Sequence, residues 1–315
     1  MPSSGPTRTI RVDPARPDSD LIDEAARVIR CGGLVAFPTE TVYGLGANAL
    51  DEEAVARVYA AKSRPWASPL IVHVSDAAMA RSITVEWPPV AATLAERFWP
   101  GPLTMVLKKA PVIPALVTAG LDTVGIRIPA HPIALELIRR AGVPVAAPSA
   151  NRFSQLSPTT AEHVQQALGE EVELILDGGP AQVGIESTVV SLWRHPPVIL
   201  RPGMISQTDL EAVTGMRWER EVDLPKIVES PGMHPRHYAP RTPFYLLEPG
   251  AEKPPGRGRV IEMPSDPQAF AARLYSELHR ADEEGWEWIA VTKPPDTPEW
   301  AGIIDRLRRA SAPEN

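Results

Sequence analysis

The chain has 315 residues, of which 43% are hydrophobic and 23% charged, a composition typical of a folded protein with about two domains. Its net charge of −7 argues against electrostatic binding of nucleic acid along the whole chain, although a local basic pocket is compatible with it. One cysteine excludes an internal disulfide, and without an apolar membrane span or a signal-peptide core we expect a cytoplasmic protein.

Helices and strands alternate along the first two thirds of the chain, which predicts an α/β domain. The first helix, 19–33, begins at a capping serine and ends in glycine. A strand buried on both faces follows at 34–38, with Cys31 as a small residue at its edge. A second helix, 51–62, must end before Pro65. Further strands are expected at 69–74, 103–109, 123–129, 143–149, 172–179, 187–193 and 197–203, and helices near 91–99, 131–142 and 160–169.

The chain divides into three predicted parts. Residues 1–215 form the larger domain, and residues 244–315 form a small α/β domain with strands at 244–249, 258–263 and 286–292 and helices at 268–285 and 302–310. The segment 216–243 between them has too little periodicity for an element and too many special residues for a tether. We therefore expect an ordered linker there.

Polar residues gather where predicted strands end, the edge at which α/β proteins commonly place ligands. Thr39, Glu40 and Thr41 follow the first strand. Lys62 and Arg64 stand at a helix exit, where two cations also merely complement the helix dipole.

Two arginines lie inside apolar strands. Arg127 and Arg201 cannot shed their charge, so each needs a carboxylate partner or a ligand anion. His73 lies in an equally apolar strand, where a core histidine is the commoner explanation than a ligand group. Lys108 ends a strand and reads as solvated.

Hydroxyl and amide side chains add donors near the same edge, although half of such groups are ordinary helix caps. They are Ser149, Asn151, Ser154, Ser157, Ser187 and Thr188. Cations with short donors suit a polyphosphate.

The sequence has no phosphate loop, dinucleotide turn, nucleophile elbow or zinc motif, so a magnesium ion would rest on ligand phosphates and water. The residues alone predict an anion pocket for a nucleotide.

Six separated motifs resemble, in order, those of the YrdC-like family: "FPTETVYGLGANA", "YAAKSRPWASPLIVHV", "TVGIRIP", "APSANRFSQLSPTT", "IESTVV" and "ILRPG". "SPGMHPRHYAP" resembles the linker of its two-domain members, the L-threonylcarbamoyladenylate synthases. The resemblance covers roughly residues 20 to 243 and is weaker beyond. It implies a twisted mixed sheet with flanking helices and a concave ligand cleft, plus a smaller Rossmann-like C-terminal domain. Ser63 and Ser68 stand where members often carry glycine and asparagine, which implies slightly altered nucleotide contacts.

The resemblance also implies a reaction. L-threonine, bicarbonate and ATP, with Mg²⁺ carried by ATP, would give threonylcarbamoyl-AMP, pyrophosphate and water, which makes the protein a nucleotidyltransferase. The product would serve threonylcarbamoyladenosine formation in tRNA through a downstream tRNA threonylcarbamoyl transferase complex, and double-stranded RNA is a further partner that the family suggests.

Site residues carry over motif by motif, with no protein nucleophile and no protein metal ligand. The catalytic pair is Lys62 and Arg64. Threonine contacts fall to Thr41, His73, Arg127, Ala147 and Ser187. ATP contacts fall to Arg64, Ser68, Thr123, Ser149, Asn151, Ser157, Arg201 and Tyr238, the last folding over the nucleotide from the linker.

Three alternatives stay open. A hydrogenase-maturation carbamoyltransferase would share the fold, but it needs cysteine-rich zinc fingers that one cysteine excludes. A double-stranded RNA-binding module would bind in a salt-dependent way without ATP turnover. A different amino-acid adenylating enzyme would use the same pocket.

Overall fold

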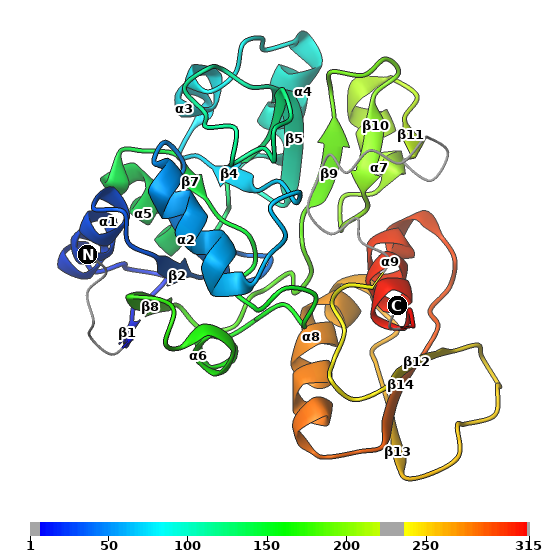
Figure 1. Cartoon of the computed structure of the whole chain (residues 1–315). Coiled ribbons are helices and arrows are strands. Elements are labelled where there is room, and N and C mark those ends of the chain that lie inside the picture. Colours follow the sequence, from blue (N-terminus) through cyan, green and yellow to red (C-terminus); the bar gives the residue numbers. More distant parts are fainter. Residues whose placement is uncertain (1–6, 221–235, 314–315) are drawn as a thin grey trace.

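Two sheets organise the computed structural model, which describes residues 7–220 and 236–313 (Figure 1). The larger sheet has eleven strands in the order β1-β8-β2-β3-β7-β4-β6-β5-β9-β10-β11, with parallel and antiparallel pairs mixed. These strands are β1 (Arg8–Arg11), β2 (Val35–Phe37), β3 (Gly44–Asn48), β4 (Ile71–His73), β5 (Leu103–Lys108), β6 (Thr123–Arg127), β7 (Val145–Ala146), β8 (Leu174–Asp177), β9 (Thr188–Ser191), β10 (Val198–Arg201) and β11 (Glu219–Arg220). The mixed α/β prediction is confirmed.

Helices cover both faces of this sheet. On one face α1 and α5 pack against each other and against β2 and β8 in one apolar cluster. The other face carries the larger cluster, to which α2, α4 and α6 contribute. Their bounds are α1 (Ser19–Arg30), α2 (Glu52–Lys62), α3 (Ala77–Ser82), α4 (Pro89–Phe98), α5 (Pro132–Ala141), α6 (Ala161–Leu168) and α7 (Gln207–Thr214).

Several local expectations need correction. Helix α1 is capped by Asp18, whose carboxylate accepts from two backbone N–H groups, and Ser19 is already helical. Cys31 ends this helix and is exposed, so it is not a strand-edge residue. Residues 44–48 form β3, a strand that was not among the expected elements, and β1, α3 and α7 were not expected either.

The C-terminal part forms its own three-stranded parallel sheet in the order β12-β14-β13. Its elements are β12 (Phe244–Leu247), β13 (Gly258–Ile261), α8 (Pro267–Glu283), β14 (Trp288–Thr292), the short 3₁₀ helix η2 (Pro298–Trp300) and α9 (Ala301–Ala310). Its apolar core continues into the larger domain through Val42, Leu156 and Ile185. Figure 1 shows α8 and α9, drawn orange and red, on the side of this unit that faces the larger domain.

The predicted linker, 216–243, falls partly outside the described residues, because the structure does not describe 221–235. Its last residues return to the larger domain, where the Ala239 amide donates to the Ser154 carbonyl at 3.1 Å. Within residues 7–220 and 236–313, no helix is long and apolar enough to cross a membrane.

Candidate active site

A cavity lies beside the carboxyl ends of β4, β6 and β10. The segments that precede β3 and β9 contribute to its lining. Nine of its lining residues were predicted site residues: Thr41, Arg64, His73, Arg127, Ala147, Ser149, Ser187, Arg201 and Tyr238. All five predicted threonine contacts are among them. The structure therefore brings together residues that lie almost 200 positions apart in sequence, from Thr41 to Tyr238.

The loop after β2 explains the run Pro-Thr-Glu-Thr. The Thr39 hydroxyl donates to the Val42 carbonyl at 2.6 Å and lies 2.8 Å from the Thr41 hydroxyl, which fixes the turn. The Thr41 hydroxyl in turn accepts from Arg127 Nη1 at 2.9 Å. These hydrogen bonds fix the conformation of the loop, in which the Thr41 hydroxyl faces the guanidinium of Arg127.

Arg127 has its own protein carboxylate. Arg127 Nη2 lies 2.6 Å from Glu40 Oε1, and both side chains are almost fully buried. Glu40 also accepts from the Ala130 amide, and Arg127 Nε donates to the Gly101 carbonyl. The charge that the sequence left in need of an anion is therefore balanced within the protein, and Glu40 was missed as a residue that orients Arg127.

His73 lies beside Arg127, since the two residues are register partners on the parallel strands β4 and β6. Burial, then the nearby charge of Arg127, lowers the pKa of His73 to about 3, so the ring is neutral. Its Nδ1 atom is buried without a hydrogen-bond partner anywhere in the described residues. A buried polar atom without a partner is rare in folded proteins, and contact with a bound ligand or water would explain it.

Two further arginines line the other part of the cavity. Arg64 donates to the carbonyls of Ser68 and Pro69, and burial lowers its pKa to about 10. Arg201 donates through Nε and Nη2 to the Ser187 carbonyl at 3.2 and 3.0 Å, and through Nη2 to the Ser187 hydroxyl at 3.2 Å. The cavity therefore carries fixed positive charge.

Glu186 carries the one carboxylate among the described residues that line the cavity. Burial alone would raise its pKa, but the charges of Arg306 and Arg201 and the hydrogen bonds from Ser157 and Arg306 together outweigh burial, so the pKa is lowered. Glu186 is therefore ionised. Sequence reasoning missed it, since a glutamate before a strand gives no local sign of burial.

The linker closes one side of the cavity with His237 and Tyr238, whose rings meet edge to face at 4.0 Å between centroids. Tyr238 is buried and has φ +61°, a left-handed conformation that costs a residue with a Cβ about 1 kcal/mol or more. His237 was not among the predicted contacts.

Five predicted contacts stand behind or away from the lining. The Lys62 amine donates to the carbonyls of Ser149, at 2.6 Å, and Asn151, and the Ser157 hydroxyl donates to Glu186 at 2.5 Å. Thr123 begins β6 and Arg127 ends it, which separates them by about 13 Å along the strand. The roles predicted for these residues, and for Ser68 and Asn151, stay predictions.

Comparison with known proteins gives two family matches. Residues 27–203 match the Sua5/YciO/YrdC family model, described as telomere recombination, and residues 205–312 match the model of the threonylcarbamoyl-AMP synthase C-terminal domain. Threonylcarbamoyl-AMP synthase of Pyrococcus abyssi is 49% identical over 91% of this chain and 93% of that protein. The Bacillus subtilis enzyme of the same name is 41% identical over 92% of each chain.

A solved structure agrees in fold as well as in sequence. The crystal structure of P. abyssi Sua5 complexed with L-threonine matches with a TM-score of 0.89 and 38% identity, covering 97% of both chains.

Proposed function

Because the chain belongs to the Sua5/YrdC family of threonylcarbamoyl-AMP synthases, we propose that it converts L-threonine, bicarbonate and ATP to threonylcarbamoyl-AMP, pyrophosphate and water. The relatives' shared name and the threonine bound to the P. abyssi protein support this activity. The product would be the activated intermediate for threonylcarbamoyladenosine in tRNA, passed on to a tRNA threonylcarbamoyl transferase complex.

The pairing of His73 with Arg127 is the observation that carries the proposal. The Arg127 guanidinium is held in place by its ion pair with Glu40 and by hydrogen bonds to Thr41 and Gly101. A guanidinium has more N–H donors than these contacts use, so donors remain that suit the threonine carboxylate. The neutral His73 ring, with Nδ1 unpartnered in the described chain, offers a polar contact for the rest of the amino acid. Thr41, Ala147 and Ser187 line the same part of the cavity.

The nucleotide would lie against Arg64, Arg201, Ser149 and Tyr238. Threonine's amine takes up bicarbonate to form a carbamate, with loss of water, and a carbamate oxygen attacks the α-phosphorus as pyrophosphate departs. This nucleotidyl transfer needs no protein nucleophile, so the protein's part is alignment and stabilisation of the phosphate charge by its arginines. His237 and Tyr238, which line the cavity, would help to keep water from the carbamate.

Magnesium would arrive with ATP. In the described ranges no group of three His, Cys, Asp or Glu side chains is placed to hold a metal ion, so phosphate oxygens and water would be its main ligands. Bound there, the ion would neutralise part of the phosphate charge.

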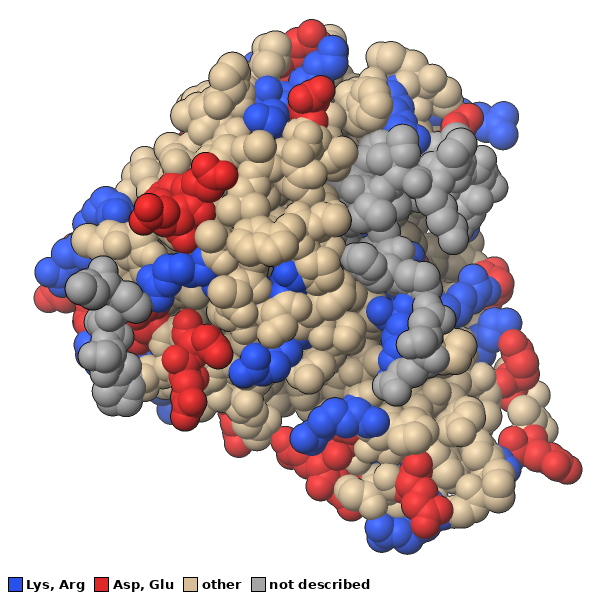
Figure 2. All heavy atoms as spheres, viewed as in Figure 1, with Lys and Arg blue, Asp and Glu red and all other residues tan. Residues whose placement is uncertain are grey.

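Double-stranded RNA binding is a weaker proposal. On the face drawn in Figure 2, the described Lys and Arg side chains are interspersed with Asp and Glu rather than gathered in one stripe. A mixed surface of this kind gives little electrostatic attraction to a phosphate backbone. We keep RNA as a partner to be tested by salt-dependent binding.

The first test is pyrophosphate release with ATP and magnesium, with threonine and bicarbonate each present or omitted. We expect release only when both are present. Arg127→Lys keeps the charge but loses the planar fork, so kcat/KM for threonine should fall by about tenfold or more. Lys108→Gln, on the exposed end of β5, is the matched control.

Release that is indifferent to threonine would contradict the proposal and indicate another nucleotide enzyme. Release supported equally by other amino acids would point to a different adenylating enzyme with the same pocket.

A further inference from the structure

One wall of the cavity is built from Glu186, Ser187 and Arg201, called here the Glu186 wall. The three are linked, because Arg201 donates to the backbone and side chain of Ser187, which follows Glu186 in the chain. The Ser187 hydroxyl also lies 2.8 Å from the hydroxyl of Thr104 on β5. The wall thus presents the cation Arg201 and the anion Glu186 side by side.

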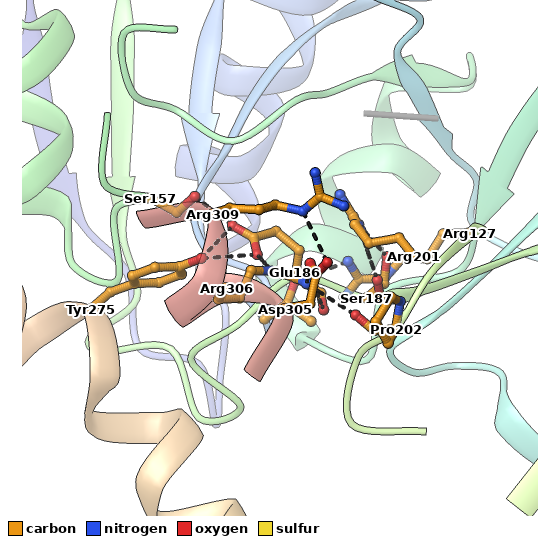
Figure 3. Close-up of polar contacts among 11 residues, drawn as sticks. Arg127, Ser157, Glu186, Ser187, Arg201, Pro202, Tyr275, Asp305, Arg306 and Arg309 are labelled. Carbon is orange, nitrogen blue, oxygen red and sulfur yellow. Dashed lines mark hydrogen bonds and ion pairs between the residues drawn. The ribbon is translucent and has the colours of Figure 1, made fainter. Parts of the chain in front are cut away.

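Two residues of the C-terminal domain contact the Glu186 carboxylate of this wall (Figure 3). Arg306, on α9, donates through Nε to Glu186 Oε2 at 2.6 Å, and its side chain is fully buried. Tyr275, on α8, directs its hydroxyl at both carboxylate oxygens, at 3.1 and 3.3 Å. Two helices of the second domain therefore converge on one carboxylate of the first.

Arg306 also contacts the backbone of the Glu186 wall and the ring of Tyr238. Its Nη2 donates to the Glu186 carbonyl at 3.3 Å and its Nη1 to the Pro202 carbonyl, next to Arg201, at 3.0 Å. Its guanidinium lies 5.1 Å from the ring centroid of Tyr238, the linker residue that closes the cavity. Asp305 pairs with Nη1 from the same helix.

Close backbone packing holds both ends of the wall against this domain. A Cβ at Gly184 would lie 2.3 Å from the Ala271 carbonyl oxygen of α8, and a Cβ at Gly302 would lie 2.7 Å from the backbone of Gly203. Contacts this short exist only because glycine stands at both places. The segments that precede Glu186 and follow Arg201 are thereby docked on α8 and α9.

We propose that Arg306, assisted by Tyr275, is a positioning residue of the C-terminal domain that holds and charge-balances the Glu186 carboxylate, next to Arg201 in the wall that would contact the phosphates of the nucleotide. The proposal rests on the proposed function and extends it, because it makes the C-terminal domain part of the nucleotide site.

Charge balance gives the reason. A buried carboxylate requires a partner, and the two cations whose charges act most strongly on Glu186 are Arg306, which pairs with it directly, and Arg201. Without Arg306, the unbalanced negative charge of Glu186 would attract Arg201 and repel any phosphate brought near it. Loss of Arg306 should therefore weaken ATP binding while leaving the Arg127 and His73 side of the cavity intact.

The test compares steady-state kinetics of full-length Arg306→Gln and Tyr275→Phe with the wild type. We expect KM for ATP to rise about tenfold or more in Arg306→Gln and about twofold to threefold in Tyr275→Phe, with KM for threonine changed less than about threefold. Arg280→Gln is the matched control, because the Arg280 side chain is more than half exposed and pairs with Glu277 of its own helix. Each variant is also melted to establish that it is folded at the assay temperature.

The double variant Glu186→Gln with Arg306→Gln separates positioning from simple loss of structure. It removes the unpaired charge, so KM for ATP should return to within about threefold of the wild type. An unchanged KM for ATP in folded Arg306→Gln, or an equal rise in Arg280→Gln, would overturn the proposal.

Calorimetric titration with ATP measures binding without turnover. It therefore distinguishes failure of the Arg306 proposal from failure of the proposed reaction. If the wild type binds ATP but releases no pyrophosphate, the proposed reaction fails, and the ATP affinities of the variants still decide on Arg306. A wild type that neither turns over nor binds ATP overturns both.

Discussion

The Lys62 amine is almost completely buried, and its hydrogen bonds go to the carbonyls of the Ser149 loop rather than into the cavity. Burial, followed by the charge of Arg64, holds the pKa of Lys62 well below its ordinary value. A lysine in this position fixes the backbone that carries Ser149. Its contribution to phosphate binding would then act through that loop.

Lys62→Met should therefore change stability more than an ordinary lysine substitution. The methionine fills the space but leaves two buried carbonyls without their donor, so we expect the free energy of unfolding to fall by about 2 kcal/mol. Urea unfolding measures this change. Lys108→Met, at an exposed strand end, should stay within about 0.5 kcal/mol of the wild type; equal effects in both variants would show that the Lys62 contacts contribute little.

Sequence reasoning finds residues whose own neighbours make them conspicuous. Arg127 and Arg201 stand out as permanent charges inside apolar strands, and both line the cavity. Glu186 does not stand out, since its partner Arg306 lies 120 residues away and nothing local indicates that distance. Partners of this kind appear only when the chain is folded.

Among the elements, apolar strands and amphipathic helices were predictable because their burial repeats at a fixed period. Strand β3 was not, because its sequence "GLGAN" has little β propensity. Its glycines are required by packing: a Cβ at Gly46 would lie 2.7 Å from the Phe37 ring and 2.9 Å from Val145. Helix α7 was missed although Ser206 and Asp209 form a capping box.

Helices α6 and α8 meet through two stacked histidines, His163 and His279, whose ring centroids are 3.9 Å apart. Burial lowers the pKa of both rings, and that of His279 to about 4, helped by the charge of His163. His279 Nε2 also lies 3.1 Å from the Ser157 carbonyl oxygen. This contact joins the two domains beside the active site.

Stability should consequently depend on pH at this contact. As pH falls from about 6.5 towards 4, the unfolded chain binds protons that the folded His279 refuses, so the free energy of unfolding decreases. Above about pH 7 neither the folded nor the unfolded chain protonates this residue, so the stability is no longer reduced. Urea unfolding measures how far the free energy of unfolding falls between pH 7.5 and pH 5.5. This decrease should be smaller in His279→Gln than in the wild type, whereas His195→Gln, a change at an exposed residue, should show the same decrease as the wild type. Identical losses in all three proteins would rule this contact out as the source.

At the scale of the whole molecule, the apolar core of the C-terminal domain includes residues of the larger domain. Val42, Leu156 and Ile185 of the larger domain pack into the cluster that α8 and α9 form. Composition and periodicity correctly indicated a second α/β unit. They could not indicate that it completes the first, because interdomain packing leaves no periodic pattern in the sequence.

Gly302→Ala tests this docking directly. Alanine favours a helix, but its Cβ would press on the Gly203 backbone, so we expect a net loss of about 1 to 3 kcal/mol and slower pyrophosphate release. Thermal unfolding and the release assay measure both effects. Arg308→Ala, on the exposed face of α9, is the control. Wild-type stability in Gly302→Ala would mean that the two domains separate easily.

The long separation between Glu186 and Arg306 also has a consequence for synthesis. At roughly 5 to 20 residues per second, the ribosome makes Arg306 about 6 to 24 s after Glu186. During that interval the carboxylate has no guanidinium from α9 and must stay hydrated or protonated. The Glu186 wall is therefore among the last parts of the nascent chain to be completed, and a chain cut short before α9 would lack the partner of its carboxylate.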